Sequence, residues 1–316
     1  MTLSVNIVIP TYNRAEATNM AVTAALAQSY QDSFVTVIDD GSSDNTFMTL
    51  KRFFADPRFL YIRLAKNLGT AQAKNVAIAL TGYDAITFHD SDDIPDRDKV
   101  LLQARVLANP TIKADPILNW RISGREPSST ISVGAALTEH QLVRADGSTF
   151  HVRRALSLVD DVFPNLQMAA GPPGDWILIN TGLFRREVFA SLGGFAPCIE
   201  EDRELRNRMI MAGEVLWVVP QPLMTKIESA DSLTVLAGTG YDSEERQRDR
   251  DLVWGRAQRW RSSGVVEKSP IELDDLAIDF VSNAERLSRA DVLMTPRTEN
   301  HLNSLLDRLG AVPTAA

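Results

Sequence analysis

The chain has 316 residues, of which 44% are hydrophobic and 23% charged, as in an ordinary globular protein with ample length for a core. Its formal net charge of −8 and pI near 5.1 argue against a general nucleic-acid binder, because such proteins carry a basic surface. A single cysteine, Cys198, cannot form an internal disulfide. A reducing, cytoplasmic setting is therefore favoured.

The sequence shows neither a signal peptide nor a membrane-spanning segment. The first fourteen residues lack the basic segment and apolar core of a signal peptide, and they indicate a strand instead. No apolar run approaches the roughly 18 residues that a membrane span needs. We therefore expect no transmembrane segment, and a peripheral position on the inner face of the membrane if the substrate lies there.

The first hundred residues show a repeating strand-and-helix pattern. Apolar, β-type runs occur at 3–9, 34–38, 60–64 and 85–88, with helical patterns at 15–28, after Asp44, at 70–80 and at 97–108. Thr11 and Asn13 are candidate caps of the first helix. Such a βαβ series predicts a mainly parallel sheet flanked by helices. Because a polar cluster follows each strand, all four clusters should meet at one rim of the sheet.

The second half is richer in loops. We expect a hairpin turning at Asp146-Gly147, a strand at 177–179, a helix at 185–192, a helix from about 200 to 212, and a strand at 215–219 that Pro220 closes. Three helices should follow, at 242–261, 271–290 and 296–309. The expected division is 1–240, with halves 1–110 and 111–240, and a helical extension at 241–316 for packing or self-association.

One acidic stretch stands out, Asp90-Ser91-Asp92-Asp93, directly after the apolar run at 85–88. Carboxylates this close raise one another's pKa unless a cation lies among them. Mg²⁺ or Mn²⁺ is the usual partner, held by one or two carboxylates together with water and substrate phosphates. The alternative is a solvated acidic turn that leads into the next helix.

Five motifs in order resemble the family 2 nucleotide-sugar glycosyltransferases over residues 3 to about 235. They are Pro10-Thr11-Tyr12-Asn13-Arg14, Asp39-Asp40-Gly41-Ser42, Asn67-Leu68-Gly69 with Lys74-Asn75, Asp90-Ser91-Asp92-Asp93, and Glu201-Asp202. The resemblance implies a GT-A fold, an α/β architecture with a Rossmann-like sheet. It also implies a divalent cation and inverting transfer of a sugar from a nucleoside diphosphate donor.

The resemblance also assigns the nucleotide site. It places Pro10, Thr11, Tyr12, Arg14 and Asp39 or Asp40 around the nucleobase, and the further nucleotide-binding residues are Asn67, Gly69, Lys74 and Asp90. A carboxylate near the base can accept the imide N–H of uracil, which makes a UDP-sugar the expected donor. Lys74 stands where the family often has arginine, so the charge is kept while the bidentate fork is lost.

The resemblance also implies which residues bind the metal and which acts as the base. The resemblance puts Asp92 or Asp93 on the metal and Asp90 or Asp92 near the ribose, and the sequence leaves both choices open. Relatives often carry a histidine in the stretch that corresponds to 226–233, where this chain offers Glu228 as a metal ligand. The base is expected to be Asp202, with Glu201 as the alternative. Both acids also suit a helix start without any chemistry.

The acceptor should be recognised by residues 111–180. Trp176 can stack on a sugar ring or simply belong to the core, and Arg144 is one of several arginines suited to an anionic acceptor. The expected function is transfer to a hydroxyl of a glycan or lipid-linked acceptor, as in bacterial surface polysaccharide synthesis. A nucleotidyltransferase is disfavoured because the loop at 10–14 has no glycine. A silent nucleotide-sugar-binding module is disfavoured because all the acidic positions are present.

Overall fold

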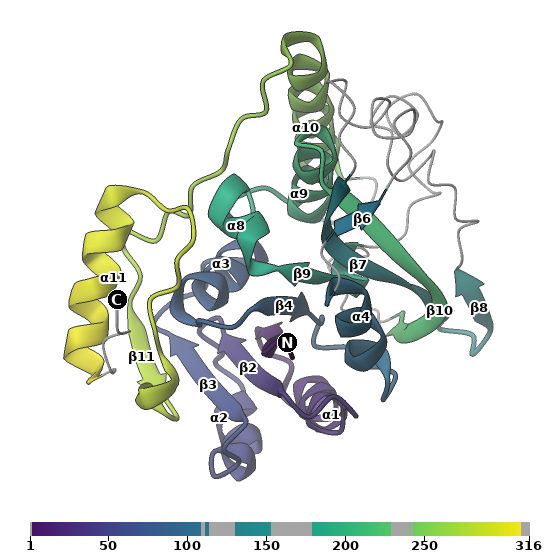
Figure 1. The fold of residues 1–316 in the computed structure, drawn as a ribbon. Helices are drawn as coiled ribbons and strands as arrows, with labels where there is room; N and C mark the ends of the chain where they lie inside the picture. Colours follow the sequence, from purple (N-terminus) through teal and green to yellow (C-terminus); the bar gives the residue numbers. More distant parts are fainter. Residues whose placement is uncertain are drawn as a thin grey trace.

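The computed structural model describes residues 2–108, 111–113, 130–152, 179–228, 240 and 243–310. Their strands form an 11-stranded sheet in the order β11-β3-β2-β1-β4-β9-β7-β10-β5, with β6 and β8 paired to β7 (Figure 1). Four neighbouring strands are parallel: β1 (Val5–Thr11), β2 (Ser33–Asp39), β3 (Phe59–Leu64) and β4 (Ala85–Phe88). The predicted mainly parallel sheet is confirmed.

Helices connect these strands, as the sequence pattern predicts. They are α1 (Ala15–Leu26), α2 (Thr46–Leu50) with the 3₁₀ turn η1 (Lys51–Phe53), α3 (Thr70–Leu80) and α4 (Lys99–Leu107). The predicted caps of α1 are wrong. The Thr11 hydroxyl contacts the Thr18 hydroxyl at 2.6 Å, and Asp44 of the next loop accepts the Ala15 N–H at 3.2 Å. An orphan donor at the helix start is therefore satisfied from a neighbouring loop.

The second half extends the sheet with short and mixed strands. They are β5 (Asp93–Pro95), β6 (Thr111–Lys113), β7 (Thr130–Val143), β8 (Thr149–Val152), β9 (Leu183–Arg185) and β10 (Val215–Ile227). Strands β7 and β8 form the predicted hairpin, in which Gly147 adopts a φ of 81°. The helical elements of this half are η2 (Ile179–Thr181), α8 (Arg186–Leu192) and α9 (Glu201–Met211).

Two predictions in this half fail. The strand expected at 177–179 is contradicted at Ile179, which begins the turn η2, while 177 and 178 lie outside the described residues. Strand β10 does not end at Pro220 but continues to Ile227, with register shifts against β7 between Val219 and Thr225. These irregularities let a strand contain proline, since no regular ladder bond from its nitrogen is then required.

The apolar core has two layers, one on each face of the sheet. Along β3, Leu60 and Ile62 belong to the layer that also holds α3, α8, α9 and α11, whereas Phe59 and Tyr61 belong to the layer with α1, α2 and α4. Side chains of a strand point alternately to opposite faces, so both layers are filled from the same strands. The result is a three-layered α/β/α arrangement around one sheet.

Residues after 240 join this core. They form α10 (Glu244–Ser263), β11 (Ile278–Val281), the 3₁₀ turn η3 (Ala284–Arg286) and α11 (Pro296–Leu309). Helices at 242–261 and 296–309 are thus confirmed, but the helix predicted over 271–290 is wrong. There β11 pairs antiparallel with β3, and Phe280 contacts Phe47 edge-on at a centroid distance of 5.0 Å.

The apolar residues at 273, 276 and 287 are nevertheless buried, so the sequence located core positions while mistaking the backbone that carries them. The division at residue 240 stays a prediction. Within the described part of the chain, no helix combines the length and apolarity needed to cross a bilayer.

Candidate functional site

The loops that follow β1 and β2 are tied together. The backbone N–H of Asn13, whose φ is 53°, donates to Ser42 Oγ at 2.9 Å. Its side-chain oxygen accepts the N–H groups of Ser43 at 2.8 Å and Asp44 at 3.2 Å. Two of the polar clusters predicted to meet at the carboxyl ends of the strands therefore do meet.

Asp39 and Asp40 connect the same region to β3 and the loop after it. Asp39 is fully buried, and its carboxylate accepts the Ser42 N–H at 2.7 Å and the Tyr61 hydroxyl. Asp40 accepts the N–H groups of Leu68 at 2.7 Å and Gly69 at 2.8 Å. Burial raises the pKa of Asp40, against the effect of these two donors. Both carboxylates hold loops in place, and their predicted contact with a nucleobase stays a prediction.

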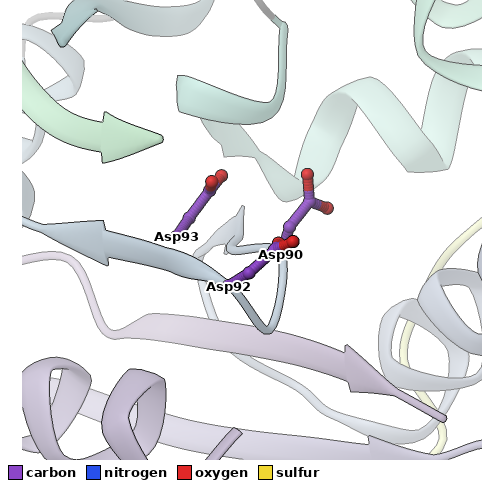
Figure 2. A group of neighbouring side chains, drawn as sticks. All are labelled: Asp90, Asp92 and Asp93. Atoms are coloured by element: carbon purple, nitrogen blue, oxygen red, sulfur yellow. The ribbon is translucent and has the colours of Figure 1, made fainter. Parts of the chain in front are cut away.

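The three aspartates after β4 form one group. Asp90 and Asp92 lie in the turn between β4 and β5, and Asp93 is the first residue of β5. One carboxylate oxygen from each lies within 4.8 Å of the others. Figure 2 shows the Asp90 and Asp93 side chains extending in the same direction from this segment. Their side-chain exposures are 29% for Asp90, 20% for Asp92 and 3% for Asp93, so the group opens to solvent on one side.

Two cationic side chains lie against these carboxylates. Arg14, from the loop after β1, pairs with Asp92 at 2.7 Å. Lys226 Nζ lies 3.0 Å from Asp90 Oδ2 and 3.4 Å from Asp93 Oδ1. Lys226 is placed there by the antiparallel pairing of β10 with β5, which sets Lys226 opposite Asp93.

The surroundings shift the pKa values of Asp90 and Asp93 in opposite directions. Burial alone would raise the pKa of Asp90, but the nearby ammonium of Lys226, and then that of Lys74, lower it. The pKa of Asp93 is raised by its deeper burial, and Asp90 and Asp92 add to the rise. One carboxylate of the group is thus held ionised while its neighbour retains its proton more readily.

Asp90, Asp92 and Asp93 suit a hard divalent ion, because each offers carboxylate oxygens as ligands. Glu228 does not join them. It is exposed, and its carboxylate accepts the Ala145 N–H at 3.3 Å. Among the described residues it makes no hydrogen bond or ion pair with the three aspartates. A metal role for Glu228 therefore has no support from the geometry.

A second acidic pair begins α9. Glu201 Oε1 lies 3.0 Å from the ammonium of Lys74, a residue of α3 with no exposed side-chain surface. Lys74 also donates to Asn180 Oδ1 at 3.4 Å, and Asn180 in turn donates to Asp90 Oδ2 at 3.4 Å. A continuous polar chain thus joins the acid pair to the three aspartates.

The ion pair also shifts the pKa values of its two members, Glu201 and Lys74. Burial raises the pKa of Glu201, and the Lys74 ammonium limits the rise. For Lys74, burial would lower the pKa, but the attraction of Glu201, Asp90 and Asp202 outweighs it. Lys74 was predicted to contact the nucleotide, and that role stays a prediction. Its observed carboxylate partner is Glu201 of the predicted acid pair.

Arginines fix the start of α9. Glu200, only 2% exposed, pairs with Arg203 at 2.8 Å and with Arg246 and Arg250 of α10 at 3.1 and 3.4 Å. Helix α10, expected only to pack or self-associate, therefore holds the segment that carries Glu201 and Asp202. The acid pair owes its place to residues far along the chain.

Residues 6–116 match the model described as glycosyl transferase family 2. The predicted resemblance is confirmed over this segment, which holds four of the five motifs. An N-acetylglucosaminyltransferase of Azorhizobium caulinodans is 31% identical over 116 residues, 35% of this chain and 29% of its own length.

A second curated relative and one solved structure extend the comparison. The poly-β-1,6-N-acetyl-D-glucosamine synthase of Staphylococcus aureus is 33% identical over 87 residues, 28% of this chain and 21% of its own length. The chain thus spans less than a third of either curated relative. The structure of S. aureus TarS 1–349 in complex with UDP-GlcNAc covers 82% of this chain and 73% of that one, with a TM-score of 0.52 at 14% identity. This likeness shows the GT-A fold predicted from the sequence.

The family 2 motifs lie at the expected rim, but their residues differ in exposure. Tyr12 is 46% exposed and Asn67 is exposed, whereas Thr11 is 4% exposed within β1. Pro10 is likewise buried in β1, and Gly69 precedes α3 with a φ of 86°. Trp176 lies outside the described residues. The predicted contact of all these residues with a nucleotide stays a prediction.

Sequence reasoning missed two residues of this site. Lys226 lies in the stretch at 226–233, where the resemblance to relatives with a histidine directs the metal-ligand prediction to Glu228 instead. Asn180 carried no motif at all. Lys226 reaches the aspartates because β10 pairs with β5 so that Lys226 lies opposite Asp93. Asn180 reaches them because η2 lies beside β4.

Proposed function

We propose that this chain is a metal-dependent inverting glycosyltransferase that moves a sugar from a UDP-sugar to an acceptor hydroxyl. The observation that carries the proposal is the polar chain from Asp90 through Asn180 and Lys74 to Glu201. It brings a carboxylate group suited to a cation and a carboxylate pair suited to a base to the same rim of a GT-A sheet. Transfer with inversion needs these two functions together.

The proposed donor is a UDP-sugar, with an N-acetylhexosamine as the first sugar to test. A relative named N-acetylglucosaminyltransferase and the UDP-GlcNAc in the TarS structure support this choice. Tyr12 and Asn67, both exposed at the rim, are the proposed nucleotide contacts, with Asp39 and Asp40 shaping the loops around the base.

The proposed cofactor is Mn²⁺ or Mg²⁺, held by Asp92 and Asp93 with Asp90 beside them. A divalent ion there would supply positive charge to the departing diphosphate. The chain's own part is to present carboxylate oxygens within 4.8 Å of one another and to keep cationic side chains near the same group.

Asp202 is the proposed general base. Its neighbour Glu201 is paired with the Lys74 ammonium, whereas the described residues give Asp202 no ion pair, so its carboxylate is the less committed of the two. In the reaction, Asp202 would take the proton from the acceptor hydroxyl while that oxygen attacks the anomeric carbon. Lys74 would keep Glu201 ionised and in position beside it.

The proposed acceptor is a glycan or a lipid-linked sugar, as in bacterial surface polysaccharide synthesis. Residues 111–180 remain the proposed acceptor region, and Trp176 is its proposed stacking residue. A cytoplasmic location, peripheral attachment to a membrane and self-association through the C-terminal helices likewise stay predictions.

The test is release of the nucleoside diphosphate from a panel of UDP-, GDP- and dTDP-sugars with and without Mn²⁺, with water receiving the sugar, alongside calorimetric binding. Only UDP-sugars should be cleaved, and only with the ion. Asp202→Asn should bind the donor normally but slow its cleavage on the order of 10²-fold or more. Glu244→Gln, which neutralises an acid whose side chain is 96% exposed on α10, should leave both unchanged.

Loss of binding together with turnover in Asp202→Asn would mean that this residue is structural. Donor binding without cleavage in the unmodified chain would instead indicate a silent binding module. Cleavage of a GDP- or dTDP-sugar in preference to every UDP-sugar would contradict the proposed donor.

A further inference from the structure

Lys226 occupies an unusual place for a lysine next to a cation site. It is the penultimate residue of β10, and its register partner is Asp93 on β5. Its ammonium contacts two of the three grouped carboxylates, at 3.0 Å from Asp90 and 3.4 Å from Asp93. The side chain is 27% exposed, so this contact is partly shielded from water. An ammonium therefore lies where oxygen ligands would otherwise face a divalent ion.

The charges at the site mean that this contact opposes the binding of a divalent ion. Three carboxylates face two directly paired cations, Lys226 on Asp90 and Asp93, and Arg14 on Asp92. A divalent ion can reach Asp90 and Asp93 together only if the Lys226 ammonium moves away. If Lys226 stayed in place, the ion would bring the charge of the fully ionised group to about +1, and like charges repel strongly at such distances in a partly buried site.

A diphosphate would reverse that balance, because it carries at least two negative charges. With it present, the displaced ammonium and the divalent ion would both have an anion to face. Since one ligand changes the local charge that the other meets, their binding must be coupled, and by the same factor in both directions.

We propose that Lys226 is a built-in counter-ion of the aspartate group that competes with the divalent cation, so that the cation binds tightly only together with a nucleoside diphosphate. The first part concerns the cation alone, and the second part rests on the proposed function for the identity of the diphosphate. The ligand classes are a hard divalent ion and a nucleoside diphosphate.

The first experiment measures Mn²⁺ binding without nucleotide, from the electron paramagnetic resonance signal of free Mn²⁺. Lys226→Met should bind Mn²⁺ about tenfold more tightly or better, because it removes one positive charge from the site. Lys226→Arg keeps that charge and should bind as weakly as the unmodified chain. Lys51→Met, which removes an exposed lysine of η1, is the matched control and should also bind weakly.

The second experiment repeats the titration with UDP present, and subtracts the loss of free Mn²⁺ that the same UDP concentration causes without protein. UDP should strengthen Mn²⁺ binding in the unmodified chain by at least tenfold, and by clearly less in Lys226→Met, in which the competing ammonium is gone. If circular dichroism shows that Lys226→Met has not folded, Lys226→Gln, which also removes the charge but keeps a polar side chain, takes its place in both experiments.

Three results would overturn the proposal: Lys226→Met binding Mn²⁺ no better than the unmodified chain, Lys226→Arg binding as tightly as Lys226→Met, or UDP leaving the Mn²⁺ affinity of the unmodified chain unchanged. None of these readouts uses sugar transfer. If they fail while UDP is still released from a UDP-sugar, the proposed function stands and the role of Lys226 falls. If the Mn²⁺ results hold while no donor is cleaved, the reverse is true.

Discussion

Lys99 offers the sharpest test of the physical reasoning, because it is a lysine buried without a direct ion pair among the described residues. It begins α4 with no exposed surface, and its amine donates to Thr87 Oγ1 and Gln103 Oε1, each at 3.0 Å. Burial lowers the pKa of Lys99 from 10.5 to about 7, and the nearby Asp93 carboxylate only partly opposes this. The folded chain thus prefers the neutral amine.

The sign of the effect on stability follows from that shift. Below pH 7 Lys99 is protonated in both states, and the folded state carries the full cost of the buried charge. Between pH 7 and 10.5 the unfolded chain binds more protons, so the free energy of unfolding rises with pH. The whole shift corresponds to about 5 kcal/mol, at ~1.4 kcal/mol per unit of pKa. From pH 7 to pH 9 the gain is about 2 kcal/mol, because the group is half-titrated at the start.

The assay is urea unfolding at pH 7, 8 and 9 for the unmodified chain, Lys99→Met and Lys51→Met. The difference between the unmodified chain and Lys99→Met isolates Lys99, since every other titrating group is shared. Lys51→Met, lacking an exposed lysine, should keep the full rise. If Lys99→Met shows the same rise as the unmodified chain, Lys99 stays charged in the fold and the argument from burial is wrong.

Three further predictions concern the supports of the site. Arg208→Met should lower the free energy of unfolding by ~3–5 kcal/mol in urea titrations, because Glu204, 2.6 Å from the fully buried Arg208, would keep only the half-exposed Arg256 at 4.0 Å as a counter-charge; a loss under about 1 kcal/mol would contradict this. Gly41→Ala should lower the melting temperature, since Gly41 has a φ of 76° and an added Cβ would lie 3.0 Å from the Lys66 backbone; an unchanged melting temperature would show that the loop adapts. Asp40→Ala should speed hydrogen exchange at the amide of Leu68, which loses its acceptor, and less at that of Gly69, which keeps Asn67 Oδ1 at 3.2 Å, while amides in β1 keep their protection; unchanged exchange at Leu68 would mean that the carboxylate does not hold this loop.

Much of the parallel half could be predicted because its signals are local. Each strand there is a short apolar run, and each helix follows within a few residues, so β4 was placed at 85–88 as observed. The placement of polar clusters at one rim followed from parallel topology alone. The contacts from Asn13 to Ser43 and from Asp40 to Gly69 bear that reasoning out.

The errors arose where partners distant in sequence decide the outcome. Apolar residues spaced three and four apart at 271–290 suit a helix, but the free backbone of β3 and the aromatic cluster around Phe280 favour a strand. Likewise Pro220 suggests the end of a strand, and only the shifted pairing with β7 shows why β10 continues. That continuation brings Lys226, rather than Glu228, to the aspartates.

The tail strand β11 has one more consequence, for behaviour in solution. Without it, Phe59–Leu64 would present a bare row of N–H and C=O groups, which is a template for joining strands from other molecules. The strand that covers this row is itself a poor template: it has four residues, an irregular register between Ile278 and Phe280, and an outward-facing charge at Asp279. The sheet thus ends in a strand that disfavours aggregation. Deleting this strand should lower the solubility of the protein more than its activity.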